Sequence, residues 1–375
     1  MRLSLLRLIS VTVVVSLLFS ACGSVEISHT DDSEITIYTT EAVTTTTEIT
    51  TIEITTEATT TTEVTTEAMT TVATTEPEPE VVTIDFSFPE EFLTELQEIF
   101  DRYEVNQNCD GDEENCSCDI YNEETDEDGN VISREKVVSI YYMDLETGYS
   151  FEINPGVHYP VASCVKIPFV VYLYEKLAAG EIDGDTVLTY EERHYMAGTG
   201  IIQEGEVGDQ YTVMELLELS VIRSDNIAYQ MLKDLISWDE FAEYCASYGC
   251  THEIDTRLTQ EKICTESAGA YARILAQFLE SDNPYVETFK SHLAITRIPM
   301  IKSSYTLYRK YGWTNYAFHD IAYVEAEHPY VLAILTNLEG EESADYDLYE
   351  EISYLIEDYA DATWAEISEN SEENT

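Results

Sequence analysis

Basic residues are scarce in this chain. Its 375 residues include 18 lysines and arginines but 74 aspartates and glutamates, which gives a formal net charge of -56. A surface of this sign repels phosphate backbones, so the composition excludes nucleic acid as a partner. The few bases are concentrated in and beside three short motifs described below. A local positive pocket on an acidic protein favours an anionic group, such as a carboxylate, on the substrate.

Long apolar runs are also missing. The clearest one, residues 8–19, is too short for a comfortable membrane span. It follows two arginines and ends in small residues before Cys22, which is typical of an export signal, and residues 18–22 resemble a bacterial lipobox. We expect a lipoprotein-type signal peptide at 1–22, a lipid on Cys22 that anchors the mature protein to a membrane, and a location outside the cytoplasm. Ordinary secretion is the alternative.

Sequence patterns for a metal site are incomplete. Histidines do not occur at zinc-site spacing, and the alternating carboxylates of residues 126–130 lack the full calcium-loop pattern. Asp128-Gly129 between two extended runs favours a hairpin turn instead. We therefore expect no metal and no cofactor. Export permits disulfides, and we expect Cys164 to stay free in the core, while the pairing among six others is left open: Cys109, Cys116, Cys118, Cys245, Cys250 and Cys264.

The chain is expected to divide into segments of different character. Residues 23–80 are nearly all Thr, Glu, Val, Ala and Ile without an amphipathic period, so they cannot bury a core and predict a disordered stalk. The folded domain is expected at 81–367. A short acidic and disordered tail is expected at 368–375.

Within the folded domain, strands at both ends surround a helical middle. This order favours an α+β fold, in which an antiparallel sheet is flanked by the terminal helices and a helical subdomain is inserted. The expected elements are a helix at 89–103, strands at 137–143 and 149–153, a helix at 163–179, a mostly helical stretch at 181–291, strands at 308–313, 318–325 and 330–338, and a helix at 346–364.

The first motif is Ser163-Cys164-Val165-Lys166. A serine hydroxyl is a poor nucleophile until a base removes its proton. Ser163 and Lys166 are three residues apart on an expected helix, so both project from one face. Pro160 upstream favours Ser163 at the helix N-terminus, where free N–H groups stabilise negative charge. Lys166 serves as a base only when neutral, and burial beside a second cation, Lys310, would lower its pKa.

The second motif is Ser224-Asp225-Asn226, which stands between two apolar stretches. We expect it at a loop or helix start, where its residues would also suit a simple N-cap. In a catalytic site, Ser224 would pass a proton to the leaving nitrogen and Asn226 would hydrogen-bond the substrate. Asp225 is expected to brace the loop.

The third motif is Lys310-Tyr311-Gly312-Trp313, in an expected strand. Lys310 would bind a substrate carboxylate, and Gly312 would leave room for a substrate along the strand. The N–H groups of Trp313 and Ser163 would form an oxyanion hole. No histidine pairs convincingly with a serine; His319-Asp320 on the next strand is interpreted as a strand-edge feature, with a bracing role as the alternative.

These motifs resemble those of the class A β-lactamase-like family of serine hydrolases. Residues 144–148 (Asp-Leu-Glu-Thr-Gly) and 198–203 (Gly-Thr-Gly-Ile-Ile-Gln) add to the resemblance, which covers about residues 89–364. It implies the β-lactamase/transpeptidase-like fold, a covalent acyl-serine intermediate and no metal. By position it makes Ser163 the nucleophile, Lys166 the base or proton shuttle, Ser224 the relay, Asn226 a substrate contact and Lys310 the carboxylate binder.

The chain departs from this family at two places. Tyr311 stands where the family usually has Thr or Ser. The family's Glu-x-x-Leu-Asn pattern, whose glutamate activates the deacylating water, is absent from residues 256–265, where Glu261 is the nearest candidate. Without a positioned base, acylation could occur while hydrolysis is slow.

The sequence therefore predicts a monomeric, exported serine hydrolase of β-lactamase type. Its substrate would be a small β-lactam or the stem peptide of peptidoglycan, cleaved at a β-lactam or D-alanyl-type amide. A penicillin-binding D-alanyl-D-alanine peptidase with slow deacylation is the first alternative. A non-catalytic cell-wall-binding module, suggested by the stalk and the 27 tyrosines, is the alternative of a different class.

Overall fold

The computed structural model describes residues 86–106, 120, 123–125, 131–250, 262–295, 297–340 and 343–373, together with three short strands nearer the N-terminus. The chain divides into two units, residues 1–82 and 83–375. In the first unit, β1 (Thr12–Ser16) lies between β2 (Ile35–Thr36) and β3 (Ile49–Glu53) in a small sheet. These strands fall within the segments predicted as signal peptide and stalk. Cys22 lies outside the described residues, and the signal peptide and the stalk stay predictions.

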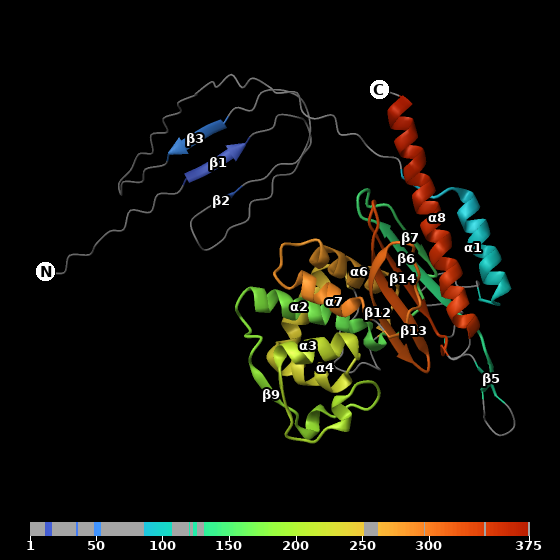
Figure 1. Ribbon diagram of the computed structural model, residues 1–375. Coiled ribbons are helices and arrows are strands. Elements are labelled where there is room, and N and C mark those ends of the chain that lie inside the picture. Colours follow the sequence, from blue (N-terminus) through green and yellow to red (C-terminus); the bar gives the residue numbers. More distant parts are fainter. Residues whose placement is uncertain are drawn as a thin grey trace, which may run out of the picture. The chain divides into compact units, whose positions relative to one another are not determined.

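The second unit is built around a five-stranded antiparallel sheet, as predicted. The strand order is β12-β13-β14-β6-β7, so β12 is an edge strand. Its members are β6 (Val138–Asp144), β7 (Ser150–Ile153), β12 (Thr306–Thr314), β13 (Ala317–Glu325) and β14 (Tyr330–Thr336). The three central strands are almost fully buried, because helices cover both faces of the sheet (Figure 1).

The two terminal helices cover one face of the sheet (Figure 1). Helix α1 (Glu90–Arg102) buries Phe92, Leu96, Ile99 and Phe100, the apolar stripe that the sequence predicted. Helix α8 runs from Ser343 to Glu373, beyond the predicted end at residue 364. The acidic segment expected as a tail is therefore helical through residue 373. Glutamate and alanine are good helix formers, which explains the extension.

The inserted helical subdomain covers the opposite face (Figure 1). Helix α6 (Thr265–Leu279) packs directly on the sheet, and the strongly apolar α2 (Lys166–Ala178) packs against α6. The other helices of the subdomain are α3 (Val213–Ile222), α4 (Asn226–Leu232), α5 (Trp238–Ser247) and α7 (Val286–Leu293). Short pairs complete it: β8 (Tyr159–Pro160) with β11 (Lys262–Ile263), and β9 (Val187–Thr189) with β10 (Gln210–Thr212).

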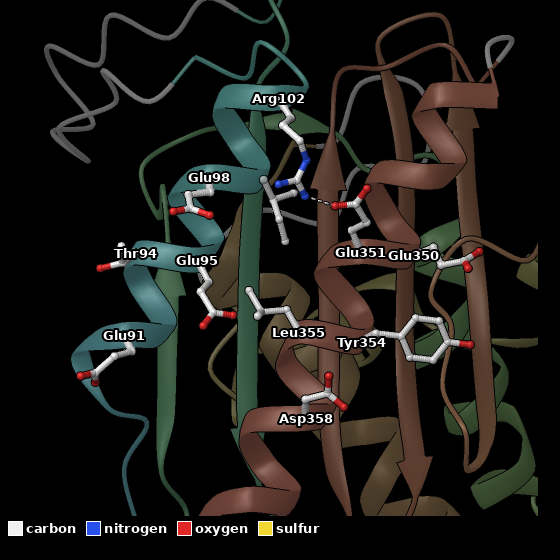
Figure 2. A pocket seen from close by; sticks show the side chains of 11 residues that line it. Glu91, Thr94, Glu95, Glu98, Arg102, Glu350, Glu351, Tyr354, Leu355 and Asp358 are labelled. Atoms are coloured by element: carbon white, nitrogen blue, oxygen red, sulfur yellow. Dashed lines mark hydrogen bonds and ion pairs between the residues drawn. The ribbon is translucent and has the colours of Figure 1, made fainter.

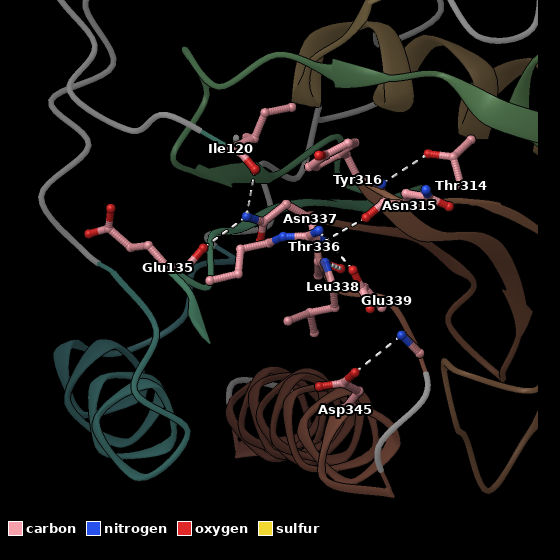
Figure 3. Close-up of polar contacts among 12 residues, drawn as sticks. Ile120, Glu135, Thr314, Asn315, Tyr316, Thr336, Asn337, Leu338, Glu339 and Asp345 are labelled. Carbon is pink, nitrogen blue, oxygen red and sulfur yellow. Dashed lines mark hydrogen bonds and ion pairs between the residues drawn. The ribbon is translucent and has the colours of Figure 1, made fainter. Parts of the chain in front are cut away.

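A buried asparagine ties the segment before β6 to the end of β14. Asn337 donates from Nδ2 to the carbonyl oxygens of Ile120 at 3.0 Å and Glu135 at 2.8 Å (Figure 3). Its Oδ1 accepts from the Val137 N–H at 2.9 Å. Nearby, β4 (Glu123–Thr125) and β5 (Val131–Arg134) pair antiparallel on either side of residues 126–130. That predicted turn lies outside the described residues.

A groove runs between α1 and α8 (Figure 2). Its lining is mostly acidic, with an ion pair between Arg102 and Glu351. None of the predicted catalytic residues lines it, so the chemistry has to be sought on the other side of the sheet. Within the described part of the chain, no helix combines the length and the apolar character that crossing a membrane requires.

Candidate active site

Ser163 lies on a tight turn between strand β8 and helix α2. The turn, η1 (Ala162–Val165), is a 3₁₀ helix that leads into α2, so Ser163 stands just before the α-helix rather than within it. Ala162 has a left-handed backbone, with φ of 50°. A non-glycine residue in this region is strained, and such strain often marks functional turns. The serine itself is half-buried.

Gly312 lets strand β12 approach this turn closely. A Cβ atom built at Gly312 would lie 2.9 Å from Cys164 Sγ and 3.1 Å from both Ala162 Cβ and the Cys164 nitrogen. The first distance is shorter than real Cβ atoms show and the other two are tighter than most real contacts, so the neighbouring atoms would have to move. The missing side chain of Gly312 therefore makes room for the turn that carries Ser163. Contact between Gly312 and a substrate stays a prediction.

The Lys166 amine points into the site from the first turn of α2. Its Nζ donates to the Ser224 carbonyl at 2.6 Å and to Asn226 Oδ1 at 2.9 Å, and lies 3.4 Å from Ser224 Oγ. Lys166 is 1% exposed. Burial, and then the positive charge of Lys310, lower the pKa of Lys166 well below its usual range, although the carboxylate of Asp225 opposes this. The amine is therefore tuned toward the neutral form that a base requires.

The Lys310 amine reaches the same hydroxyl from β12. Its Nζ donates to Ser224 Oγ at 2.9 Å and to the Tyr311 carbonyl at 2.9 Å. Burial lowers the pKa of Lys310 to about 8, against the opposing influence of Cys164 and Asp320. The structure thus brings together three residues that are far apart in the sequence, with Ser224 Oγ between two buried amines.

The loop that carries Ser224 is held in an unusual conformation. Ser224 has φ of 50°, and it lies between α3 and α4 as predicted. Asp225 braces the loop: its Oδ1 accepts from the N–H groups of Ile227 and Ala228 at the start of α4. Its Oδ2 accepts from the N–H groups of residues 201 and 202. One carboxylate therefore fixes both α4 and the neighbouring loop.

Residues 197–203 form that neighbouring loop. Thr199 Oγ1 donates to the Ser224 carbonyl at 2.7 Å, and Asn226 Nδ2 donates to the Ala197 carbonyl at 3.1 Å. Gly200 has φ of 122°, and a Cβ there would lie 2.2 Å from the Asp225 carboxyl carbon, so glycine is required. The sequence indicates this loop only through its resemblance to the family and predicts no role for it, because its contacts with Ser224 join distant segments.

Tyr311 replaces the hydroxyl residue of the family pattern without supplying a hydroxyl to Ser224. Its side chain is buried in the core on the α1 and α8 face, in the cluster that also contains Phe318 and Ile301. The Lys310 Nζ lies 4.2 Å from the centre of the Tyr311 ring, close enough for a cation–π contact. The aromatic ring therefore faces the lysine that precedes it.

His319 and Asp320 are not strand-edge features. Both are fully buried in the central strand β13. His319 Nε2 lies 3.0 Å from the Pro160 carbonyl, just before the Ser163 turn, and its Nδ1 accepts from the Thr336 N–H at 3.1 Å. Burial lowers the pKa of His319 to about 4, so the imidazole is neutral at ordinary pH. His319 thus contacts the segment just before the Ser163 turn, whereas Asp320 pairs with Arg309 at 2.6 Å.

Other predicted residues can be placed only in part. Trp313 follows Gly312 on β12 with a side chain that is 44% exposed. Glu261 lies outside the described residues, as do Cys109, Cys116 and Cys118.

Cys164 is free and buried, as predicted, and burial raises the pKa of its thiol, so the thiol is inert. Among the described residues, no cluster of histidine, cysteine and carboxylate side chains is suited to hold a metal ion.

Comparison with known proteins decides the family. The model of the beta-lactamase enzyme family matches residues 128–360, more than half of the chain. The chain belongs to the beta-lactamase enzyme family. Comparison with curated proteins gives no match.

Solved structures of the beta-lactamase fold are similar to this member of the family. PBP-A has a TM-score of 0.53 at 19% identity, covering 59% of this chain and 88% of its own. A mutant of PBP-A, described as an acyl-enzyme complex with penicillin G, has a TM-score of 0.53 at 18% identity, covering 59% of this chain and 89% of its own. A beta-lactamase from Sphaerobacter thermophilus has a TM-score of 0.54 at 17% identity, covering 60% of this chain and 92% of its own. Because the sequence identities are below 20%, these structures establish the fold alone, which is β-lactamase/transpeptidase-like.

Proposed function

We propose that this member of the beta-lactamase enzyme family is a serine hydrolase that attacks β-lactam amides through a covalent acyl-Ser163. One observation carries the proposal: Ser224 Oγ lies 2.9 Å from Lys310 Nζ and 3.4 Å from Lys166 Nζ. A hydroxyl between a depressed-pKa amine and a second cation has the form of a proton relay. A purely structural serine has little use for two buried lysines, whose desolvation is costly.

Acylation would begin with neutral Lys166 taking the proton of the Ser163 hydroxyl as the oxygen attacks the amide carbonyl. The N–H groups of Ser163 and Trp313 would stabilise the resulting oxyanion. The carbon–nitrogen bond then breaks, and the leaving nitrogen takes a proton from Ser224. Ser224 recovers a proton from the Lys166 ammonium, so the protons balance. In this scheme Asn226 and protonated Lys310 bind the substrate, Lys310 through its carboxylate.

Deacylation requires a water molecule and a base. We propose Glu261 for this role, as the nearest carboxylate in the segment where the family pattern is missing. The absence of that pattern also favours a second function, a penicillin-binding D-alanyl-D-alanine peptidase in which the acyl-enzyme is released slowly. Both functions share the acylation step and differ in the lifetime of the penicilloyl ester and in whether a D-alanyl peptide is cleaved.

The test is the intact mass of the purified protein over time after mixing with benzylpenicillin. The proposal predicts an adduct with the mass of the penicillin, absent in Ser163→Ala. Release within seconds, with turnover of nitrocefin, supports the β-lactamase. An adduct that persists for hours, with release of D-alanine from a pentapeptide, supports the peptidase. No adduct with any β-lactam, together with specific binding to cell-wall sacculi, would reject both in favour of a binding module.

A further inference from the structure

The end of helix α5 is held against helix α6. A Schellman motif ends α5, in which the Cys250 N–H donates to the Cys245 carbonyl at 3.2 Å and Gly249 has φ of 90°. From α6, Arg273 donates through Nη2 to the Tyr248 carbonyl at 2.8 Å, one residue before that glycine. Cys250, the residue that follows the motif's glycine, is therefore fixed beside α6.

Two cysteines contact one hydroxyl in the first turn of α6. The Cys250 thiol lies 3.7 Å from Ser267 Oγ, and the Cys264 thiol lies 3.9 Å from the same oxygen. All three residues are buried. Disulfide formation requires two sulfurs at bonding distance on nearby backbones. Because both sulfurs already contact one atom, a change of side-chain rotamer can bring them to that distance.

Cys264 is the N-cap residue of α6, a position where helix N–H groups favour a thiolate. Burial nevertheless raises the pKa of the Cys264 thiol, because the hydrogen bonds from Ser267 and Glu266 oppose it only in part. The thiol therefore reacts slowly with external reagents once the protein is folded. A disulfide formed here during folding is shielded from reduction for the same reason.

The residue before Cys264 connects the two cysteines to the turn that carries Ser163. Ile263, on β11, pairs with Tyr159 on β8, and β8 leads directly into that turn. A bond between Cys250 and Cys264 closes a ring of about 15 residues, a length at which cross-linking stabilises a fold appreciably. The ring includes β11, so the bond also strengthens the support of β8.

We infer that Cys250 and Cys264 form a disulfide that joins the end of α5 to the start of α6. The oxidant is another disulfide, on a small molecule or an oxidoreductase. The Cys264 thiolate attacks one sulfur of the oxidant and releases the other as a thiolate. The Cys250 thiolate then attacks the Cys264 sulfur and releases the second. The two cysteines lose two protons and two electrons, and the reduced oxidant takes up both. The inference does not depend on the proposed function, because neither cysteine takes part in the reaction at Ser163.

Peptide mapping locates the bond. The protein is refolded in equimolar reduced and oxidised glutathione, denatured with excess iodoacetamide to alkylate every remaining thiol, and digested with trypsin. We expect residues 234–257 to be linked to residues 263–273, with Cys250 bonded to Cys264 and Cys245 alkylated. Alkylation of both Cys250 and Cys264, or a bond from either one to a different cysteine, would overturn the inference.

Thermal unfolding tests whether the bond stabilises the fold. Protein reduced with dithiothreitol should melt about 5–10 °C below the oxidised protein, as expected for a ring of this length. Cys264→Ser keeps a good N-cap residue but cannot form the bond, so it should lose this difference. Cys245→Ala changes a neighbouring buried cysteine and should keep it. An equal difference in the wild-type protein and in Cys264→Ser would contradict the stabilising role.

Discussion

Replacing Gly312 by alanine tests how the fold positions the nucleophile. The added Cβ would lie 2.9 Å from Cys164 Sγ and 3.1 Å from the Cys164 nitrogen, both fully buried in the turn that carries Ser163. Overpacking of this kind costs about 1–3 kcal/mol. The turn can relieve the overlap only by moving away from β12 by a few tenths of an ångström or more.

That displacement acts directly on the proposed oxyanion hole, since its two N–H groups belong to Ser163 and Trp313. We expect the rate of acylation by benzylpenicillin to fall by about 10-fold, because a misplacement of about 1 Å costs about 100-fold and the turn moves by less than that. The melting temperature should fall by about 2–4 °C for each kcal/mol of strain. Mass spectrometry of samples quenched at successive times measures the rate of acylation, and thermal unfolding measures the melting temperature.

Two further variants identify the cause. In Gly184→Ala the nearest atoms belong to the flexible side chain of Met214, so little should change. Adding Cys164→Ala to Gly312→Ala removes the closest contact and should restore part of the rate. Full acylation activity and an unchanged melting temperature in Gly312→Ala would refute the argument that close packing at this glycine places the nucleophile.

Three other predictions follow from the structure. Acylation should slow above about pH 8, because Lys310 has a pKa of about 8 and loses the positive charge assigned to substrate binding; a rate that stays constant to pH 10 would contradict that role. Asn337→Ala should lower the free energy of unfolding by about 3 kcal/mol, because buried backbone groups of Ile120, Glu135 and Val137 lose their hydrogen-bond partner. Urea titration measures this change, and an unchanged midpoint of unfolding would show that water replaces the Asn337 side chain. Cys22→Ala should release the protein from bacterial membranes into the soluble fraction if Cys22 carries the lipid, and equal membrane fractions for both proteins would reject the anchor.

Much of the architecture could be predicted because the relevant signals are local. The apolar stripe of α1, the hairpin between β6 and β7, and the apolar α2 all depend on residues close in sequence, and each appears within a few residues of its predicted bounds. The position of Ser224 between two helices followed from the same periodicity. The proximity of Lys166, Ser224 and Lys310 could also be predicted, because the three motifs that carry these residues occur together in this chain.

The features that the sequence did not reveal depend on contacts between distant segments. The sequence suggested only that Gly312 leaves room for a substrate, whereas in the structure its lack of a side chain makes room for Cys164 and Ala162. His319 was placed at a strand edge, since nothing local shows that it braces the Pro160 carbonyl from a central strand. The left-handed backbone of Ser224 likewise has no local signal, because serine rarely adopts it and tertiary contacts impose it.

The ionisation of the two buried lysines is the most direct test of the account. Protein carrying ¹³C-labelled lysine can be titrated by NMR, with Lys166 and Lys310 assigned from Lys166→Arg and Lys310→Arg. We predict that the Lys166 amine titrates well below its usual range and that Lys310 titrates near pH 8. If both amines stay protonated until the ordinary lysine range above pH 10, neither can act as the neutral base and the proposed acylation is contradicted.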